Sequence, residues 1–141
     1  MRVLNILARR CLPLEKFDAT VAFYENLISQ RARMRFEYPA HGLRLAQVAN
    51  LLLIGGNAVS LVAFTATNAT YLVDDIQAYA VYLPTIGVEV LRLVQAVPSG
   101  WNMLARHPDG AIVEYVQHRD PHPADVMANV EYSRDFASRN S

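Results

Sequence analysis

The sequence has little of what marks a membrane, extracellular or nucleic-acid-binding protein. Its 13 basic and 13 acidic residues cancel, so no net field attracts nucleic acid or an anionic membrane. The single cysteine, Cys11, has no intramolecular partner for a disulfide, which favours a reducing compartment and predicts a cytoplasmic protein. No apolar run reaches the roughly 20 residues of a membrane span, because glycines at 55 and 56 interrupt the longest one.

The chain does have enough apolar residues for a packed core. Hydrophobic residues make up 52% of its 141 positions and charged residues 18%, which is typical of a globular protein. This length fits one compact unit that buries a sizeable core.

The first part of the chain predicts a strand, a helix and three further strands. An apolar strand over residues 3–12 ends at Pro13. Apolar side chains at helical spacing predict a helix over residues 17–28. Period-two and apolar segments then predict strands over residues 34–38, 43–48 and 51–54, with turn residues from Pro39 to Gly42.

The same order of elements recurs about sixty residues later. A strand is predicted over residues 68–73 and a helix over residues 76–83, with Pro84 making its end irregular and Gly87 stopping it. Three strands follow over residues 88–97, 101–106 and 111–117. A repeated order of this kind indicates two related modules.

Several short motifs within these modules match one known family. They are Phe23-Tyr24-Glu25-Asn26-Leu27, Leu72-Val73-Asp74-Asp75-Ile76, Gly87-Val88-Glu89-Val90, and Pro108-Asp109-Gly110 followed by Glu114. Their order and spacing resemble the vicinal oxygen chelate superfamily, which includes glyoxalase I, extradiol dioxygenases and bleomycin-resistance proteins. The resemblance implies an α+β fold, in which two tandem βαβββ modules form curved mixed sheets around a cavity.

The resemblance also sets the expected domain boundaries. Residues 1–118 are expected to form a single domain, with one module over residues 1–57 and the second over residues 66–118. Residues 119–141 are expected to form a C-terminal tail, in which residues 124–136 have the pattern of a short amphipathic helix.

Enzymes of the superfamily hold a divalent metal with ligands on the first and last strand of each module. The second module offers Asn68 and Glu114 at these positions, and the first offers Arg9, or Asn5 or Leu7 if the strand is shifted. No Asp, Glu or His occurs from residue 43 to residue 65 to supply the fourth ligand. Because an arginine repels a cation and one carboxylate does not hold a metal, we expect no metal and no cofactor.

The resemblance directs attention to ligand binding instead. We expect Glu114 to accept a hydrogen bond from a ligand or to pair with Arg9, and Asn68 to supply a further polar contact. The alternatives for Glu114 are a solvated acid at a strand end and a general base, although no His or Lys partner is recognisable beside it.

Aromatic and thioether side chains complete the predicted binding site. Trp101 and Met103 share one face of a strand and are expected to line the cavity, the alternative being ordinary core packing. Phe36 and Tyr38, with Met34, form a similar face in the first module, unless that face packs under the helix.

The remaining histidines predict no site. His118 and His122 are four residues apart, but Pro121 and Pro123 exclude a helix there, so we expect a disordered tail. His107 is expected to be a surface turn residue.

These observations predict a metal-free small-molecule-binding protein that sequesters a hydrophobic aromatic compound, similar to the antibiotic-resistance, drug-binding branch of the superfamily. It is expected to be a homodimer with no nucleic-acid or membrane partner. The alternative is a glyoxalase-like or dioxygenase-like lyase or isomerase that acts on a small organic substrate. A third possibility is an interaction protein with a filled cavity.

Overall fold

The computed structural model describes residues 1–126 and contains two compact units. The first unit is Leu7–Ala69, and the second combines Met1–Ile6 with the chain from Thr70 onward. The first strand, β1 (Val3–Pro13), begins in the second unit and continues into the first. Each unit is described by itself.

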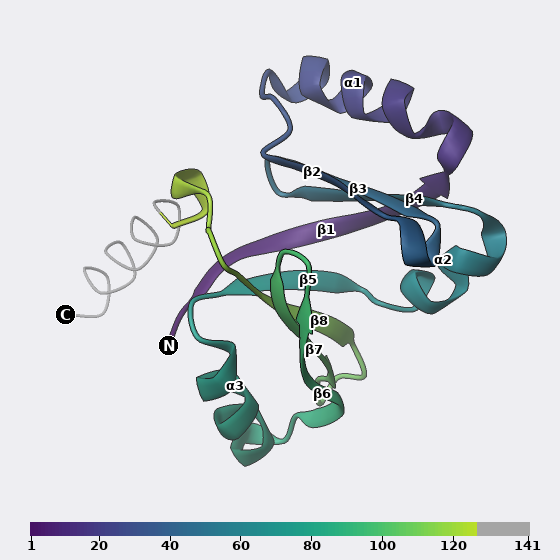
Figure 1. Cartoon of the computed structure of the whole chain (residues 1–141). Helices are drawn as coiled ribbons and strands as arrows, with labels where there is room; N and C mark the ends of the chain where they lie inside the picture. The colour runs from purple at the N-terminus through teal and green to yellow at the C-terminus, as the bar shows by residue number, and fades with distance from the viewer. Residues whose placement is uncertain (127–141) are drawn as a thin grey trace. The chain divides into compact units, whose positions relative to one another are not determined.

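The first unit is a four-stranded mixed sheet with a long helix (Figure 1). After β1, the chain forms α1 (Phe17–Ile28), β2 (Met34–Tyr38), β3 (Leu43–Val48), β4 (Leu51–Gly56) and α2 (Ala58–Thr65). The strand order is β2-β3-β4-β1, in which β1 is parallel to β4 and the other pairs are antiparallel.

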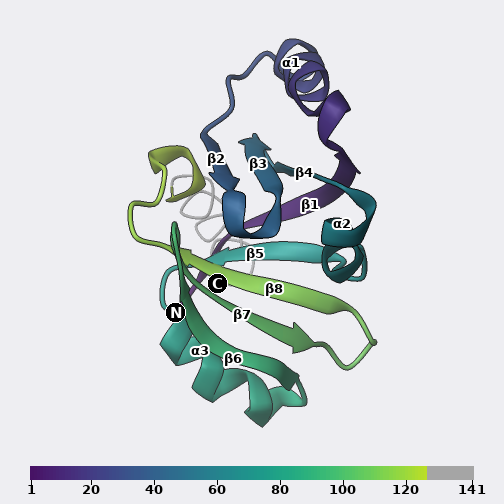
Figure 2. The same ribbon diagram turned by 45° about the vertical axis from the view of Figure 1, so that its right-hand side comes forward.

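Apolar side chains spaced along α1 hold this helix against one face of the sheet. Phe17 and Val21 are 0% exposed, and they form a core cluster with Leu12, Ala46, Val48 and Leu53. Gly55 on β4 makes the close approach possible, because a Cβ at this position would lie 2.7 Å from Cδ2 of Phe17. Figure 2 shows the same ribbon diagram from a second direction.

The second unit repeats the strand-helix-strand-strand-strand order. It consists of β5 (Ala69–Val73), α3 (Ile76–Tyr82), β6 (Glu89–Val97), β7 (Gly100–Arg106) and β8 (Ile112–His118), with the strand order β5-β8-β7-β6. The core beneath α3 contains Val73, Ile76, Tyr79, Leu83, Val88, Met103, Ala105, Val113 and Tyr115. Pro84 lies in a 3-10 turn after α3, which gives the irregular helix end that the sequence predicts.

The structure confirms the predicted α+β fold class with two βαβββ modules. It also contains α2, a helix that the sequence interpretation missed. Asn57 caps it, since its Oδ1 accepts a hydrogen bond of 2.8 Å from the Ser60 amide. The sequence interpretation predicts a strand over residues 51–54 that ends at two glycines and no element over residues 58–65, and the capping asparagine is the overlooked signal.

The bounds of α1, β2 and β3 match the predicted ones, and those of the other predicted elements differ by one or two residues. In the described part of the tail, a helical segment begins at Pro123 and reaches Val126, and the rest of the predicted helix lies outside the described residues. None of the helices within residues 1–126 is long and apolar enough to cross a membrane.

Candidate functional site

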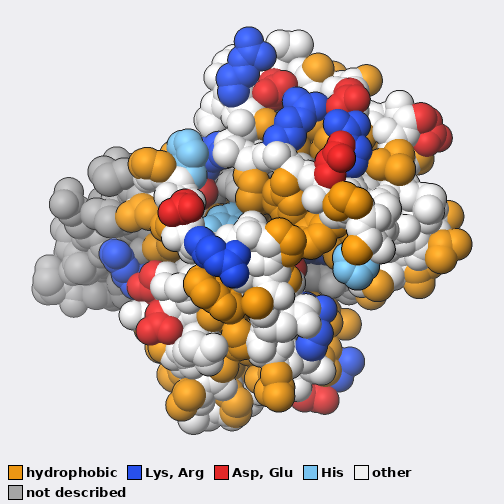
Figure 3. Space-filling view, in the orientation of Figure 1, with side chains coloured by type: hydrophobic (Ala, Val, Ile, Leu, Met, Phe, Trp, Pro, Cys, Tyr) orange, Lys and Arg blue, Asp and Glu red, His pale blue; other side chains and the backbone are white. Residues whose placement is uncertain are grey.

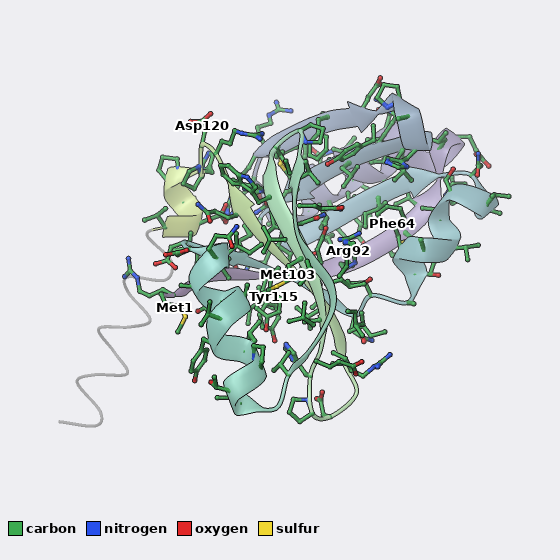
Figure 4. All side chains as sticks on the ribbon, turned by 60° about the horizontal axis from the view of Figure 1, so that its bottom comes forward. Met1, Phe64, Arg92, Met103, Tyr115 and Asp120 are labelled. Carbon is green, nitrogen blue, oxygen red and sulfur yellow. The ribbon has the colours of Figure 1, made fainter. Side chains whose placement is uncertain are left out.

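The central strands of the second unit have two chemically different faces. Cross-strand partners share a face, and Met103 pairs with Tyr115 while Asn102 pairs with Val116. Met103 and Tyr115 belong to the core beneath α3, and Figure 4 shows them together under that helix. The even-numbered residues of β7 and β8, among them Asn102 and Glu114, therefore lie on the face turned away from α3.

A hydrogen-bonded network surrounds Glu114 on this outer face. Thr70 Oγ1 of β5 donates to Glu114 Oε1 at 3.0 Å, and Asn102 Nδ2 of β7 donates to Glu114 Oε2 at 3.0 Å. Thr70 is 2% exposed, while Glu114 and Asn102 are half-buried. Two neutral donors on neighbouring strands thus fix the orientation of one carboxylate.

The edge strand β6 adds a positive charge to this network. Arg92 Nη2 donates to Asn102 Oδ1 at 3.3 Å, so the Asn102 amide connects the guanidinium to the carboxylate. Arg92 is exposed, and Figure 4 shows it on the side of the strands away from α3. We call Thr70, Arg92, Asn102 and Glu114 the Glu114 network.

The same face of β8 ends at His118, which is half-buried in the strand. Burial lowers the pKa of the His118 imidazole, although the negative charges of Asp125 and Glu114 act in the opposite direction. Asp125 is 2% exposed, and its Oδ1 accepts a hydrogen bond of 2.7 Å from Asn5 Nδ2 of β1. His118 thus lies within an ordered strand rather than in the disordered tail that the sequence suggested.

Trp101 and Met103 share one strand face as predicted, but this is the α3 face and not the face of Glu114. Met103 is 0% exposed and lies in the core, and Trp101 packs against the same cluster. The Arg119 guanidinium lies 4.8 Å from the centre of the Trp101 ring. The structure therefore places both residues in the core packing that was the alternative interpretation, and a ligand stacked between them would have to displace Arg119 and the core.

Phe36 and Tyr38 of the first unit lie on the sheet face opposite α1. Arg35 of β2 forms a 2.9 Å ion pair with Asp18 of α1, so the odd-numbered residues of β2 face the helix. Phe36 and Tyr38 consequently face away from α1, with their rings 5.2 Å apart in an edge-to-face pair. Basic and acidic side chains also gather on the surface near α1, as Figure 3 shows.

Arg9 and Asn68 are the two remaining residues of the predicted site. Arg9 lies on β1 and pairs with Leu52 of β4, and its Nη2 donates to the Phe64 carbonyl at 3.3 Å. Asn68 is exposed and precedes β5. Thr70, two residues further along, is the β5 side chain that donates to Glu114.

The residues present do not fit a divalent metal. Both oxygens of Glu114 accept hydrogen bonds from neutral donors, and no group of three or more His, Cys, Asp or Glu within residues 1–126 could hold an ion. Threonine, asparagine and arginine side chains around one carboxylate do not replace the His and carboxylate ligands that transition metals prefer.

Four side chains described in this subsection escaped the sequence interpretation, namely Thr70, Arg92, Asn102 and Asp125. Asn102 lies between Trp101 and Met103, so the strand alternation that places those two on one face places Asn102 on the other. His107 also differs from its expected role, because its Nε2 lies 2.7 Å from Tyr115 Oη. Burial raises the pKa of the Tyr115 hydroxyl to about 12, so this pair belongs to the core rather than to a reactive site.

Comparison with solved structures identifies the fold. A methylmalonyl-CoA epimerase variant from Streptomyces coelicolor in complex with 2-nitronate-propionyl-CoA matches with a TM-score of 0.59 and 20% identity, over 84% of this chain and 100% of that one. The epimerase from Mycobacterium tuberculosis matches with a TM-score of 0.61 and 16% identity, over 86% and 91% of the two chains. The chain therefore has the vicinal oxygen chelate fold.

A nearer relative defines the family. An uncharacterized protein from Methanosarcina mazei has a TM-score of 0.78 and 38% identity, over 86% of this chain and 98% of that one. This chain belongs to the same family as the archaeal protein. No model of a protein family matches the sequence, and no curated protein matches it. The neighbours do not support the drug-resistance branch that the sequence suggested.

Proposed function

We propose that this chain is an enzyme of the isomerase or lyase type, which moves a proton on a small organic substrate without a bound metal. The observation that carries the proposal is the Glu114 network, in which a carboxylate is fixed by two donors and connected to a guanidinium. The likeness to epimerases in fold supports the same class of reaction.

The network supplies the two groups that proton transfer next to a carbonyl requires. Glu114 takes the proton as the C–H bond breaks, and the electron pair moves onto the carbonyl oxygen to form an enolate. The positive charge of Arg92 stabilises this oxygen. Delivery of a proton from water to the opposite face of the enolate inverts the carbon, and Glu114 then releases its own proton to water. Loss of a β-substituent from the enolate instead completes an elimination.

Hydrogen–deuterium exchange at the substrate carbon tests this proposal. Methylmalonyl-CoA, the substrate named for the fold neighbours, and other small thioesters and 2-substituted ketones are incubated in D2O and followed by NMR. Glu114→Gln keeps the size and an acceptor oxygen but removes the base. Exchange should fall by roughly 10²–10⁴-fold, the usual contribution of a positioned general base.

Glu89→Gln is the matched control. Glu89 is an exposed acid on β6 that pairs with Arg106 at 2.9 Å, and neither residue belongs to the Glu114 network. Its substitution removes the same charge and should leave exchange unchanged. Wild-type exchange in Glu114→Gln would refute the assignment of Glu114 as the base.

The second candidate function is the sequestration of an aromatic compound, which the first unit favours. Phe36 and Tyr38 form a half-buried aromatic wall. Arg9 of the same unit pairs with Leu52 across β1 and β4, and cross-strand partners share a sheet face. Flat, amphipathic walls of this kind bind planar ligands. Antibiotic resistance would follow if the ligand were a drug.

Calorimetric titration of aromatic compounds that raise the melting temperature separates the two candidates. A sequestering protein binds without chemical change, and Phe36→Ala should weaken binding by about tenfold, or ~1.4 kcal/mol. Phe23→Ala is the control, because Phe23 is 57% exposed on α1. Equal affinities in both variants would remove the aromatic wall from the site.

A further inference from the structure

A segment that follows β8 brings a buried carboxylate against β1 within the second unit. We call residues 119–126 the strap. Its root is fixed, because Arg119 Nη1 donates to the carbonyls of Val97 at 3.0 Å and Pro98 at 2.9 Å, and the Arg119 amide donates to the Ser99 carbonyl at 3.0 Å. Its far end carries Asp125, which is 2% exposed.

The Asp125 carboxylate is buried and accepts a hydrogen bond from a side chain of β1. Asn5 Nδ2 donates to its carboxylate at 2.7 Å, which is in the range of a charge-assisted hydrogen bond. The charge of Asp125 also acts on His118, at the end of the β8 face that carries Glu114. Burying a carboxylate is costly unless donors compensate it, so an apolar residue would anchor the strap at lower cost.

From the buried contact between Asn5 and Asp125 we propose that the Asn5 side chain is a donor of a binding subsite for a ligand carboxylate, and that Asp125 occupies this subsite as a tethered competitor. The strap then acts as an internal inhibitor of carboxylate binding. A short tether holds Asp125 at an effective concentration of about millimolar, so a free carboxylate binds well only after the strap leaves. The proposal concerns binding and does not depend on proton transfer by Glu114.

The test is a calorimetric titration of the full-length protein with malonate, a small dicarboxylate, which reads binding equally in variants that lack Asn5. Asp125→Ala removes the competitor and should lower the apparent Kd for malonate by at least about tenfold. Asp120→Ala is the matched control. It makes the same charge change within the strap, at an exposed residue that Figure 4 shows at the strap's surface, and should bind malonate as weakly as the wild type.

Two further variants decide between a subsite and a simple anchor. Asn5→Ala combined with Asp125→Ala removes a donor of the subsite and should return malonate binding to the wild-type level. Asp125→Asn keeps the shape of the strap but not its charge. If Asp125→Ala lowers folded stability too far for titration, Asp125→Asn should still bind malonate several-fold more tightly than the wild type.

The outcomes are distinct. Malonate affinity in Asp125→Asn equal to that in Asp120→Ala would overturn the proposal and leave Asp125 as a structural anchor. Tight binding that persists in the Asn5/Asp125 double variant would place the anion elsewhere and would also overturn it. Neither result bears on Glu114→Gln, because that substitution leaves Asn5, His118 and Asp125 in place.

Discussion

At the residue scale, the chemistry of Glu114 depends on neighbours from three strands. Thr70, Asn102 and, through Asn102, Arg92 set its orientation. A carboxylate that is part-buried needs such donors, and a lost partner costs more than an exposed hydrogen bond would. The stability of the second unit and the geometry of its candidate site are therefore linked through Thr70.

Substitution of Thr70 tests this link. Thr70→Val removes the hydroxyl with little change in shape and should lower the free energy of unfolding by about 1–3 kcal/mol. Thr70→Ser keeps the donor and should cost about 1 kcal/mol for the lost methyl group. Urea unfolding of both variants measures the difference, and an equal cost in the two would show that the hydrogen bond to Glu114 adds nothing.

His118 gives the protein a pH dependence of known sign. Burial lowers its pKa below the ordinary value of 6.5, so in this pH range the unfolded chain takes up the proton first. Its contribution to stability is present above about pH 6.5 and is lost as the pH falls through the folded-state pKa.

The melting temperature at about pH 7.5 and about pH 5 measures this effect. We expect the wild type to lose more stability between these values than His118→Gln, in which the neutral side chain cannot titrate. Asp18, whose pKa is lowered mainly by its hydrogen bond to Arg44, affects stability only in a more acidic range. Equal losses in wild type and variant would contradict the assignment to His118.

At the scale of elements, glycines decide how closely strands and helices approach. Gly55 leaves room for Phe17 beneath α1, and Gly100 begins β7 beside β8. A Cβ at Gly100 would lie 1.9 Å from the Gln117 carbonyl oxygen, which is backbone and cannot rotate away. The β7–β8 pairing, and with it the position of Asn102 beside Glu114, requires glycine at this point.

Gly100→Ala should accordingly destabilise the protein by roughly 3 kcal/mol or more, since an overpacked site must shift backbone. Gly110→Ala is the control. Gly110 also has a positive φ of 92°, but nothing lies within 4 Å of a Cβ built there, so the cost is limited to the roughly 1–2 kcal/mol of a left-handed backbone. Denaturant unfolding that ranks the two variants equally would refute the steric explanation.

At the scale of the whole molecule, the described chain leaves strand edges and apolar side chains accessible. β6 is an edge strand in the second unit and carries Leu93, which is 78% exposed. Val59 on α2 is 85% exposed. Exposed edges and apolar side chains favour association between copies of a chain.

We therefore predict a homodimer, in which the tail or the first strand contributes contacts. Sedimentation velocity at micromolar concentration should give the mass of two chains of 15.8 kDa. Leu93→Lys should shift the equilibrium toward the monomer if β6 takes part, whereas Leu27→Lys, at a residue 66% exposed on α1, should not. A one-chain mass for the wild type would contradict the prediction.

The sequence by itself determined the order and type of most elements. Phe17–Ile28 has apolar residues at helical spacing, and Met34–Tyr38 alternates with period two, so local physics sufficed for both. The Pro108-Asp109-Gly110 turn likewise placed Glu114 on the last strand. The element that was missed, α2, has apolar residues on all sides and therefore no periodicity that distinguishes a helix from a buried strand.

Only the tertiary structure decided which face of each strand is covered. Alternation shows that Trp101 and Met103 share a face, but packing against α3 decides that this face is core and that Asn102 lies beside Glu114. The ion pair between Arg35 and Asp18 shows that the odd-numbered residues of β2 face α1. Phe36 and Tyr38 therefore lie on the face that this helix does not cover. The sequence also gave no sign that Asp125 meets Asn5, because that contact joins residues 120 positions apart, and such contacts arise from the folded chain rather than from any local pattern.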